Sequence, residues 1–213
     1  MIDEDGEIVP PMAFIPPAER YDLMPKIDEW VIGHVIKQLQ KDTSDSVYAI
    51  NLSGQSLTDN KFAEQTIKTL SESNINQHRL CFEITETAAI ANLHNATEFL
   101  TQLQALGCYT ALDDFGSGLS SFAYLKSLPI NYLKIDGMFV RQIAKDETSR
   151  VMVEAINSIG HTMHLKTIAE FVEDESIKNL LEEMGVDYAQ GYYYGQPAPL
   201  ENVRMKSSTV NQR

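Results

Sequence analysis

The stretch Thr110-Ala111-Leu112-Asp113-Asp114-Phe115-Gly116-Ser117-Gly118 joins an apolar run to two adjacent carboxylates and then to a loop bracketed by glycines. The apolar residues predict a buried strand over 109–113, and the glycines predict a turn after it. Two neighbouring aspartates at a strand end repel one another unless a cation or a proton offsets their charge. The pair therefore indicates either a site for a divalent metal ion or a solvated turn, in which Asp, Gly and Ser are ordinary residues.

Five other short apolar runs also end on a polar or charged residue. These runs span 47–52, 80–85, 132–136, 165–169 and 186–190. Their ends carry Asn51, Glu83, Lys134, Glu170 and Gln190. Between the runs, apolar residues at helical spacing predict helices over about 25–39, 62–70, 92–106, 122–128, 148–161 and 174–184. The proline-rich first 20 residues are expected to be irregular.

Apolar strands that alternate with helices predict an α/β fold with a parallel sheet covered on both faces. A doubly wound sheet and a barrel both fit this alternation. A doubly wound sheet gathers its functional groups at one switch point, whereas a barrel gathers them at the carboxyl ends of all its strands. Polar residues at the ends of six successive strands favour the barrel. Because a closed barrel has eight strands, we expect an incomplete (β/α) barrel whose two missing strands precede Met1.

Charge and composition limit the classes of partner. The 213 residues predict one domain, and the net charge of −13 argues against a broad basic surface for DNA or RNA. An anionic substrate would therefore need a bridging metal ion. No apolar run approaches the roughly 20 residues of a membrane span. Cys81 and Cys108 lie in apolar runs and predict free thiols, which fits a reducing, cytoplasmic location.

Four of the residues at the strand ends offer only oxygen donors: Asn51, Glu83, Asp113 and Asp114. This set suits Mg²⁺ or Mn²⁺ better than a zinc site of thiolates and imidazoles. Two such ions can clamp a phosphoryl group and activate a water molecule. Lys134 is expected to stay protonated among these acids and either to act on a phosphate or its attacking water or to form a simple salt bridge. Glu170 either completes the metal shell or acts as a base.

Seven motifs follow one another along residues 6–200. They are Phe14-Ile15-Pro16 with Ala18-Glu19, Asn51-Leu52-Ser53, Glu83-Ile84-Thr85-Glu86, Asp113-Asp114-Phe115-Gly116-Ser117-Gly118, Leu133-Lys134-Ile135-Asp136, Ala169-Glu170-Phe171-Val172-Glu173 and Gln190-Gly191-Tyr192. In this order and spacing they resemble the EAL-domain family, the bacterial cyclic di-GMP phosphodiesterases. The resemblance implies a TIM-like (β/α) barrel over residues 1–204, with a polar C-terminal tail over 205–213. It also implies two Mg²⁺ or Mn²⁺ ions and hydrolysis of cyclic di-GMP to the linear dinucleotide.

The resemblance also implies a role for each matching residue. The implied metal-shell residues are Asn51, Glu83, Asp113, Asp114 and Glu170. Lys134 would help to position the attacking water and, with Glu83, Asp113 and Glu170, would form the catalytic set. Residues near the substrate or behind the metal ligands would be Gln190, Glu173 and Asp136. Glu86 would anchor the loop that begins at Asp114.

The chain departs from the family pattern at several points. The Glu-Ala-Leu strand and the strand before it are absent, and with them a metal-ligating glutamate and an arginine that contacts substrate phosphate. Phe171 stands where the family usually has glycine, Gly137 replaces a common arginine, and Asp174 replaces the usual threonine. Ser117 replaces a threonine, which is a mild change.

The missing strands would leave two sheet edges open. Because open apolar edges invite pairing with another chain, we expect a homodimer or a swapped oligomer. Three functions remain open on the sequence. The chain is a cyclic di-GMP phosphodiesterase domain impaired by truncation, an inactive cyclic di-GMP sensor, or a dimerising protein-interaction module.

Overall fold

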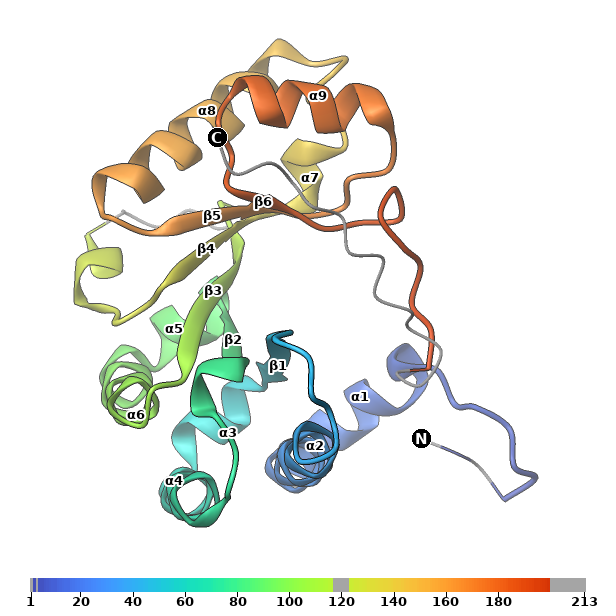
Figure 1. Ribbon diagram of the computed structural model, residues 1–213, viewed down its shortest axis with the longest axis vertical. Helices are drawn as coiled ribbons and strands as arrows, with labels where there is room; N and C mark the ends of the chain where they lie inside the picture. Colours follow the sequence, from blue (N-terminus) through green and yellow to red (C-terminus); the bar gives the residue numbers. More distant parts are fainter. Residues whose placement is uncertain (1, 3, 117–122, 200–213) are drawn as a thin grey trace.

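The computed structural model describes residues 2, 4–116 and 123–199. Its centre is a six-stranded parallel sheet in which neighbouring strands are consecutive in the sequence (Figure 1). The strands are β1 (Tyr48–Leu52), β2 (Leu80–Thr85), β3 (Tyr109–Phe115), β4 (Tyr132–Ile135), β5 (Lys166–Ala169) and β6 (Tyr188–Ala189). This sequential order is that of a barrel and differs from the reversed order of a doubly wound sheet.

Helices connect each strand to the next. The long helices are α1 (Pro11–Arg20), α2 (Met24–Leu39), α4 (Asn60–Glu72), α6 (Leu93–Ala105), α8 (Glu147–Thr162) and α9 (Glu175–Glu183). The short ones are α3 (Gly54–Thr58), α5 (Glu86–Ala91), α7 (Gly137–Val140) and the 3₁₀ turns η1 (Gln77–Arg79) and η2 (Tyr124–Ser127). Figure 1 shows α4, α6, α8 and α9 along the outer side of the curved sheet. In the described part of the chain, no helix is long and apolar enough to cross a membrane.

Several helices begin directly at the carboxyl end of a strand, where a side chain caps them. The hydroxyl of Thr85, the last residue of β2, accepts a hydrogen bond from the backbone N–H of Ala88 in α5. The carboxylate of Asp136, which follows β4, accepts one from the N–H of Met138 in α7 at 2.7 Å. Capping of this kind satisfies the free N–H groups of a first helical turn. These two strand-to-helix junctions are thereby fixed at the edge where the polar strand ends lie.

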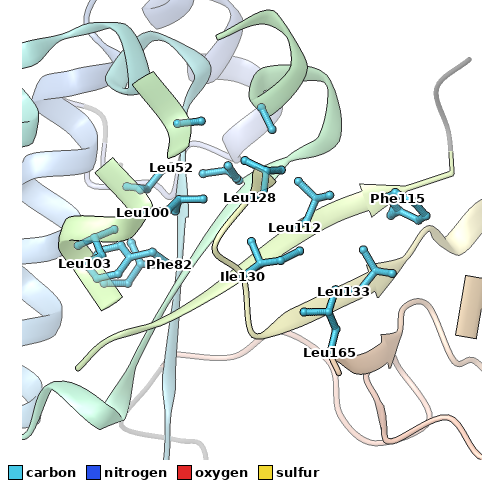
Figure 2. Packing of buried hydrophobic residues seen from close by; sticks show 14 of the residues in the cluster. Leu52, Phe82, Leu100, Leu103, Leu112, Phe115, Leu128, Ile130, Leu133 and Leu165 are labelled. Atoms are coloured by element: carbon cyan, nitrogen blue, oxygen red, sulfur yellow. The ribbon is translucent and has the colours of Figure 1, made fainter. Parts of the chain in front are cut away.

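The outer face of the sheet is apolar and packs against the helices. Leu112 of β3 and Leu133 of β4 are fully buried and lie side by side in the strand register. Figure 2 shows them in one cluster with Phe115, while Phe82 of β2 packs near Leu100 and Leu103 of α6. Because side chains alternate along a strand, the residues between these apolar ones point to the opposite, inner face.

The sheet is not a closed barrel. Among the described residues, β1 pairs only with β2 and β6 pairs only with β5, so each leaves one edge open. On β1, Ala49 and Asn51 are exposed, although Ile50 and Leu52 on the outer face are buried. The expected architecture, an incomplete (β/α) barrel with six strands, is confirmed.

Most predicted elements occur within a few residues of their expected places, but the first 20 residues do not match. Residues 11–20 form α1, so the expectation of an irregular segment is wrong for them. Pro11 occupies a first-turn position, where its missing N–H costs no hydrogen bond. The helix buries Ala18. The sequence also missed α3, α5 and α7, and the helix expected over 122–128 is only the turn η2, with Phe122 outside the described residues.

Candidate active site

One lysine joins three carboxylates from neighbouring strands. The ammonium of Lys134 on β4 lies 2.7 Å from Glu83 Oε2 on β2 and 2.9 Å from Asp113 Oδ1 on β3. It also lies 2.8 Å from Oε1 of Glu170, the residue that follows β5. All four side chains are buried. Four of the strand-end residues that the sequence analysis selected therefore meet at one point, and we call these four the Lys134 cluster.

The strand register explains this convergence. Glu83 pairs with Ala111, and Asp113 lies two residues further along β3 on the same face. Lys134 pairs with Ile168, and Glu170 lies two residues further along on that face. Residues two apart in a strand share a face, so all four side chains point inward from the sheet. Their apolar neighbours point outward into the core.

Burial and charge set the protonation states of the cluster. Burial disfavours the charged form of Lys134, but the nearby charges of Glu83, Asp113 and Glu170 outweigh this and raise its pKa. Lys134 therefore remains a cation, as expected. Burial raises the pKa of Glu83, and it raises the pKa of Glu170 to about 7, although Lys134 partly opposes both shifts. The site thus holds more carboxylates than one ammonium can stabilise in ionised form.

Asp114 joins the cluster through a break in the strand pattern. Its φ is +54°, and the β3–β4 register shifts between Leu112 and Phe115. In a regular strand Asp113 and Asp114 would point to opposite faces. The local irregularity instead brings carboxylate oxygens of Asp113, Asp114 and Glu170 within 4.8 Å of one another. Burial, followed by the charges of Asp113 and Asp136, raises the pKa of Asp114.

This carboxylate group fits a divalent metal ion. Asp113, Asp114 and Glu170 present hard oxygen donors, which Mg²⁺ and Mn²⁺ prefer. Burial is the main reason that the pKa values of Asp114 and Glu170 are raised, and the neighbouring carboxylates add to it. A bound cation would favour the ionised form of both groups. Gln190 supports the group by donating from Nε2 to Glu170 Oε1 at 2.7 Å.

Glu86 ties down both flanks of the segment 117–122, which lies outside the described residues together with Ser117 and Gly118. Its Oε2 accepts a hydrogen bond of 2.9 Å from the N–H of Gly116, and its Oε1 accepts one of 2.6 Å from the hydroxyl of Tyr124. Glu86 is buried, and burial also raises the pKa of Tyr124. The sequence analysis missed Tyr124 because nothing in the spacing of a predicted helix linked it to Glu86.

Three other candidate residues lie outside these contacts. Asn51 is beside Glu83 in the strand register, but its side chain is exposed and makes no described contact with the Lys134 cluster. Asp136 caps α7, and its charge contributes to the raised pKa of Asp114. Glu173 is exposed and forms an ion pair of 3.4 Å with Arg141. The tail expected over 205–213 lies outside the described residues.

The fold and the site together define a class of protein: a parallel (β/α) barrel with an acidic, metal-competent site at the carboxyl ends of its strands. The profile of the EAL domain matches residues 1–197, and the chain belongs to the EAL-domain family.

Curated relatives agree with this assignment. The cyclic di-GMP phosphodiesterase PdeB of Shewanella oneidensis is 43% identical over 198 residues, which are 92% of this chain and 23% of PdeB. The cyclic di-GMP phosphodiesterase PdeF of Escherichia coli is 36% identical over 203 residues, which are 94% of this chain and 27% of PdeF. The chain therefore spans about a quarter of the length of these relatives.

Solved structures show the same architecture. The FimX EAL domain from Pseudomonas aeruginosa bound to c-di-GMP superimposes with a TM-score of 0.87 at 30% identity, covering 93% of this chain and 81% of that one. The PaMucR phosphodiesterase in complex with c-di-GMP gives a TM-score of 0.85 at 32% identity, covering 93% of this chain and 82% of that one.

Proposed function

We propose that this chain is a cyclic di-GMP phosphodiesterase domain, with the EAL domain over residues 1–204, that hydrolyses cyclic di-GMP to the linear dinucleotide. The observation that carries the proposal is the convergence of Glu83, Asp113 and Glu170 on Lys134, with Asp114 beside them. Relatives named cyclic di-GMP phosphodiesterases support the choice of substrate.

We assign the metal shell to the carboxylates that lie together, with Mg²⁺ or Mn²⁺ as the ion. Asp113, Asp114 and Glu170 would hold one ion, and Glu83 with Asn51 would contribute to a second. Bound ions of this kind polarise a phosphoryl group and lower the pKa of a coordinated water. No basic patch is needed for the anionic substrate, because the ions would offset the negative charge of both partners.

The chain's own residues orient the reaction. Lys134 holds the three carboxylates together, and its raised pKa keeps it a cation and not a base. It would help to position the attacking water through the carboxylates that it orders. Gln190 fixes one oxygen of Glu170 and leaves the other for the ion. In the overall step a water oxygen forms a new bond to phosphorus, the P–O bond to one ribose oxygen breaks, and that oxygen gains a proton.

A direct assay tests the proposal. The purified chain is incubated with cyclic di-GMP and Mg²⁺ or Mn²⁺, and products are separated by chromatography, with Glu83→Gln as the matched control. Linear dinucleotide from the wild type but not from the variant supports the proposal. No product from either would overturn it.

A second candidate function is a catalytically inactive cyclic di-GMP sensor. The exposure of Asn51 beside the open edge of β1 favours it, because an incompletely assembled metal shell would bind nucleotide without hydrolysing it. Binding of cyclic di-GMP without product in the same assay would establish the sensor. If the chain neither binds nor hydrolyses cyclic di-GMP, the dimerising protein-interaction module remains as its function.

We also propose that a second copy of the chain covers the open side, giving a homodimer or a swapped oligomer. An apolar groove of about 760 Å³ lies between α1 and α2, the helix that contacts β1, and is lined by Phe14, Pro17, Ile27 and Trp30 among others. Trp30 is 68% exposed. Light scattering after size exclusion tests this proposal, and a monomer at all concentrations would contradict it.

The free buried thiols of Cys81 and Cys108 support a cytoplasmic location.

A further inference from the structure

Phe171, the residue after Glu170, has a left-handed backbone. Its φ is +53°, a backbone conformation that residues other than glycine rarely adopt. Such strain persists only where surrounding contacts hold it, and it clusters at functional sites. The ring is also 45% exposed, so burial alone does not account for a phenylalanine at this position.

Gly137 provides the space for the ring. A Cβ atom at Gly137 would lie 2.1 Å from Cδ2 of Phe171 and 2.7 Å from its Cγ. No other residue fits there while the ring keeps its place. The Phe171 ring after β5 therefore occupies the space that a side chain at position 137 of α7 would need.

Arg141 lies over this ring. Its guanidinium carbon is 4.0 Å from the centre of the Phe171 ring, and its Nε is 3.4 Å from Glu173 Oε1. Arg141 stands four residues after Gly137, which places both on one helical face. Stacking on an aromatic ring and pairing with a carboxylate hold the planar guanidinium in one orientation.

Arg141 is an exposed cation beside the carboxyl ends of two strands that carry the Lys134 cluster. Phe171 directly follows Glu170 at the end of β5, and Gly137 lies three residues after Lys134 of β4. The residues that hold Arg141 therefore follow two of the strands that carry the Lys134 cluster. Lys134 is buried and engaged by three carboxylates. Arg141 is 46% exposed, and within the described residues its terminal Nη groups have no acceptor.

We propose that Gly137, Phe171 and Glu173 hold Arg141 as a substrate-binding residue for the cyclic dinucleotide. The inference rests on the proposed function. The guanidinium of Arg141 donates two parallel hydrogen bonds to a pair of acceptor atoms on the ligand. The phosphate has two such oxygens, and guanine has them as O6 and N7. A purely structural role would give the protein little, because exposed Arg–carboxylate pairs contribute weakly to stability.

The test compares Arg141→Gln with Arg150→Gln. Arg150 is a matched control, since it is 45% exposed and pairs with Glu154 at 3.8 Å on α8. Binding of cyclic di-GMP is measured in the Glu83→Gln background with Mg²⁺, and KM is measured in the wild-type background. We expect Arg141→Gln to raise both constants by about tenfold or more. Arg150→Gln should leave both constants within twofold of their starting values. The two variants should change the melting temperature by the same amount.

Two ligand arms separate phosphate from guanine. If Arg141 contacts phosphate, Arg141→Gln weakens cyclic di-GMP and cyclic di-AMP equally and lowers the salt dependence of binding. If it contacts guanine, the variant loses the preference for cyclic di-GMP over cyclic di-AMP. Either result supports the proposal.

Variants of Gly137 and Phe171 give an independent test. Gly137→Ala displaces the Phe171 ring, so it should weaken binding of cyclic di-GMP although Arg141 is present. Gly137→Ala combined with Phe171→Gly should restore the stability of the chain but not its affinity. If the wild-type chain neither binds nor hydrolyses cyclic di-GMP, the proposed function and this inference both fail. If it binds and Arg141→Gln leaves the affinity within twofold, only this inference is overturned.

Discussion

Lys134 Nζ lies 2.7 Å from Glu83 Oε2, and both side chains are almost fully buried. A buried ion pair costs desolvation energy, so it persists only where further partners compensate. Here Asp113 and Glu170 supply those partners from the strands on either side. The inner face of the sheet therefore holds one cation shared among carboxylates, an arrangement that serves a reaction better than it serves stability.

Replacing this lysine should be costly. Lys134→Met removes the cation and leaves Glu83, Asp113 and Glu170 buried without a counter-charge. We expect a loss of about 3–5 kcal/mol in the free energy of unfolding in urea at pH 7, with loss of hydrolysis. The control is Lys178→Met, which breaks an exposed pair with Glu182 and should cost less than about 1 kcal/mol. Equal losses in the two variants would contradict the central role of Lys134.

Divalent ions should stabilise the folded chain. Mn²⁺ or Mg²⁺ at about 100 times its dissociation constant should raise the melting temperature by about 5–10 °C, because it binds only the assembled carboxylates. A chelator should reverse the shift, and Asp114→Asn should remove most of it. Asp59→Asn, which keeps a residue of similar capping strength at the start of α4, should leave the starting temperature nearly unchanged and keep the shift. A shift unaffected by Asp114→Asn would rule out this metal position.

The hydroxyl of Tyr124 should matter through Glu86. Tyr124→Phe leaves one buried carboxylate oxygen of Glu86 without its 2.6 Å donor. We expect a loss of about 1–3 kcal/mol in the free energy of unfolding and a fall in turnover, since both flanks of 117–122 depend on Glu86. Tyr21→Phe, at a tyrosine that is 70% exposed, is the control. If stability falls and turnover does not, Glu86 supports the fold and not the reaction.

Acid should weaken the junction between β5 and β6 through Asp187. Burial raises its pKa, but Lys166, the N–H of Thr167 and His161 outweigh this and lower the pKa to about 2. A carboxyl group whose pKa falls on folding stabilises the protein above its ordinary pKa, and this stabilisation disappears as the pH drops from about 4 to 2. Asp187→Asn should therefore cost about 2 kcal/mol at pH 7 and much less near pH 2.5. Urea unfolding at both pH values measures the difference, and an equal cost at both would exclude this linkage.

Much of the site was predictable because it depends on strand ends. The carboxyl ends of parallel strands meet at one edge, so the polar residues after successive apolar runs had to approach one another. This rule alone selects Glu83, Asp113, Lys134 and Glu170, which do meet, and indicates an open barrel. Both predictions follow from the periodicity of the apolar runs and from their order along the chain.

Contacts between distant segments decided the rest. The pairing of Tyr124 with Glu86 joins residues 38 apart, and the ring of Phe171 occupies the space above Gly137, 34 positions earlier. The left-handed backbone of Asp114 accompanies a shift in register between two strands, and α1 forms although three of its ten residues are proline. None of these has a signal in local spacing, because each exists only where packing brings two separate parts of the chain to the same place. Residue patterns thus set the strand order and the acidic rim, whereas tertiary packing set which side chains touch there.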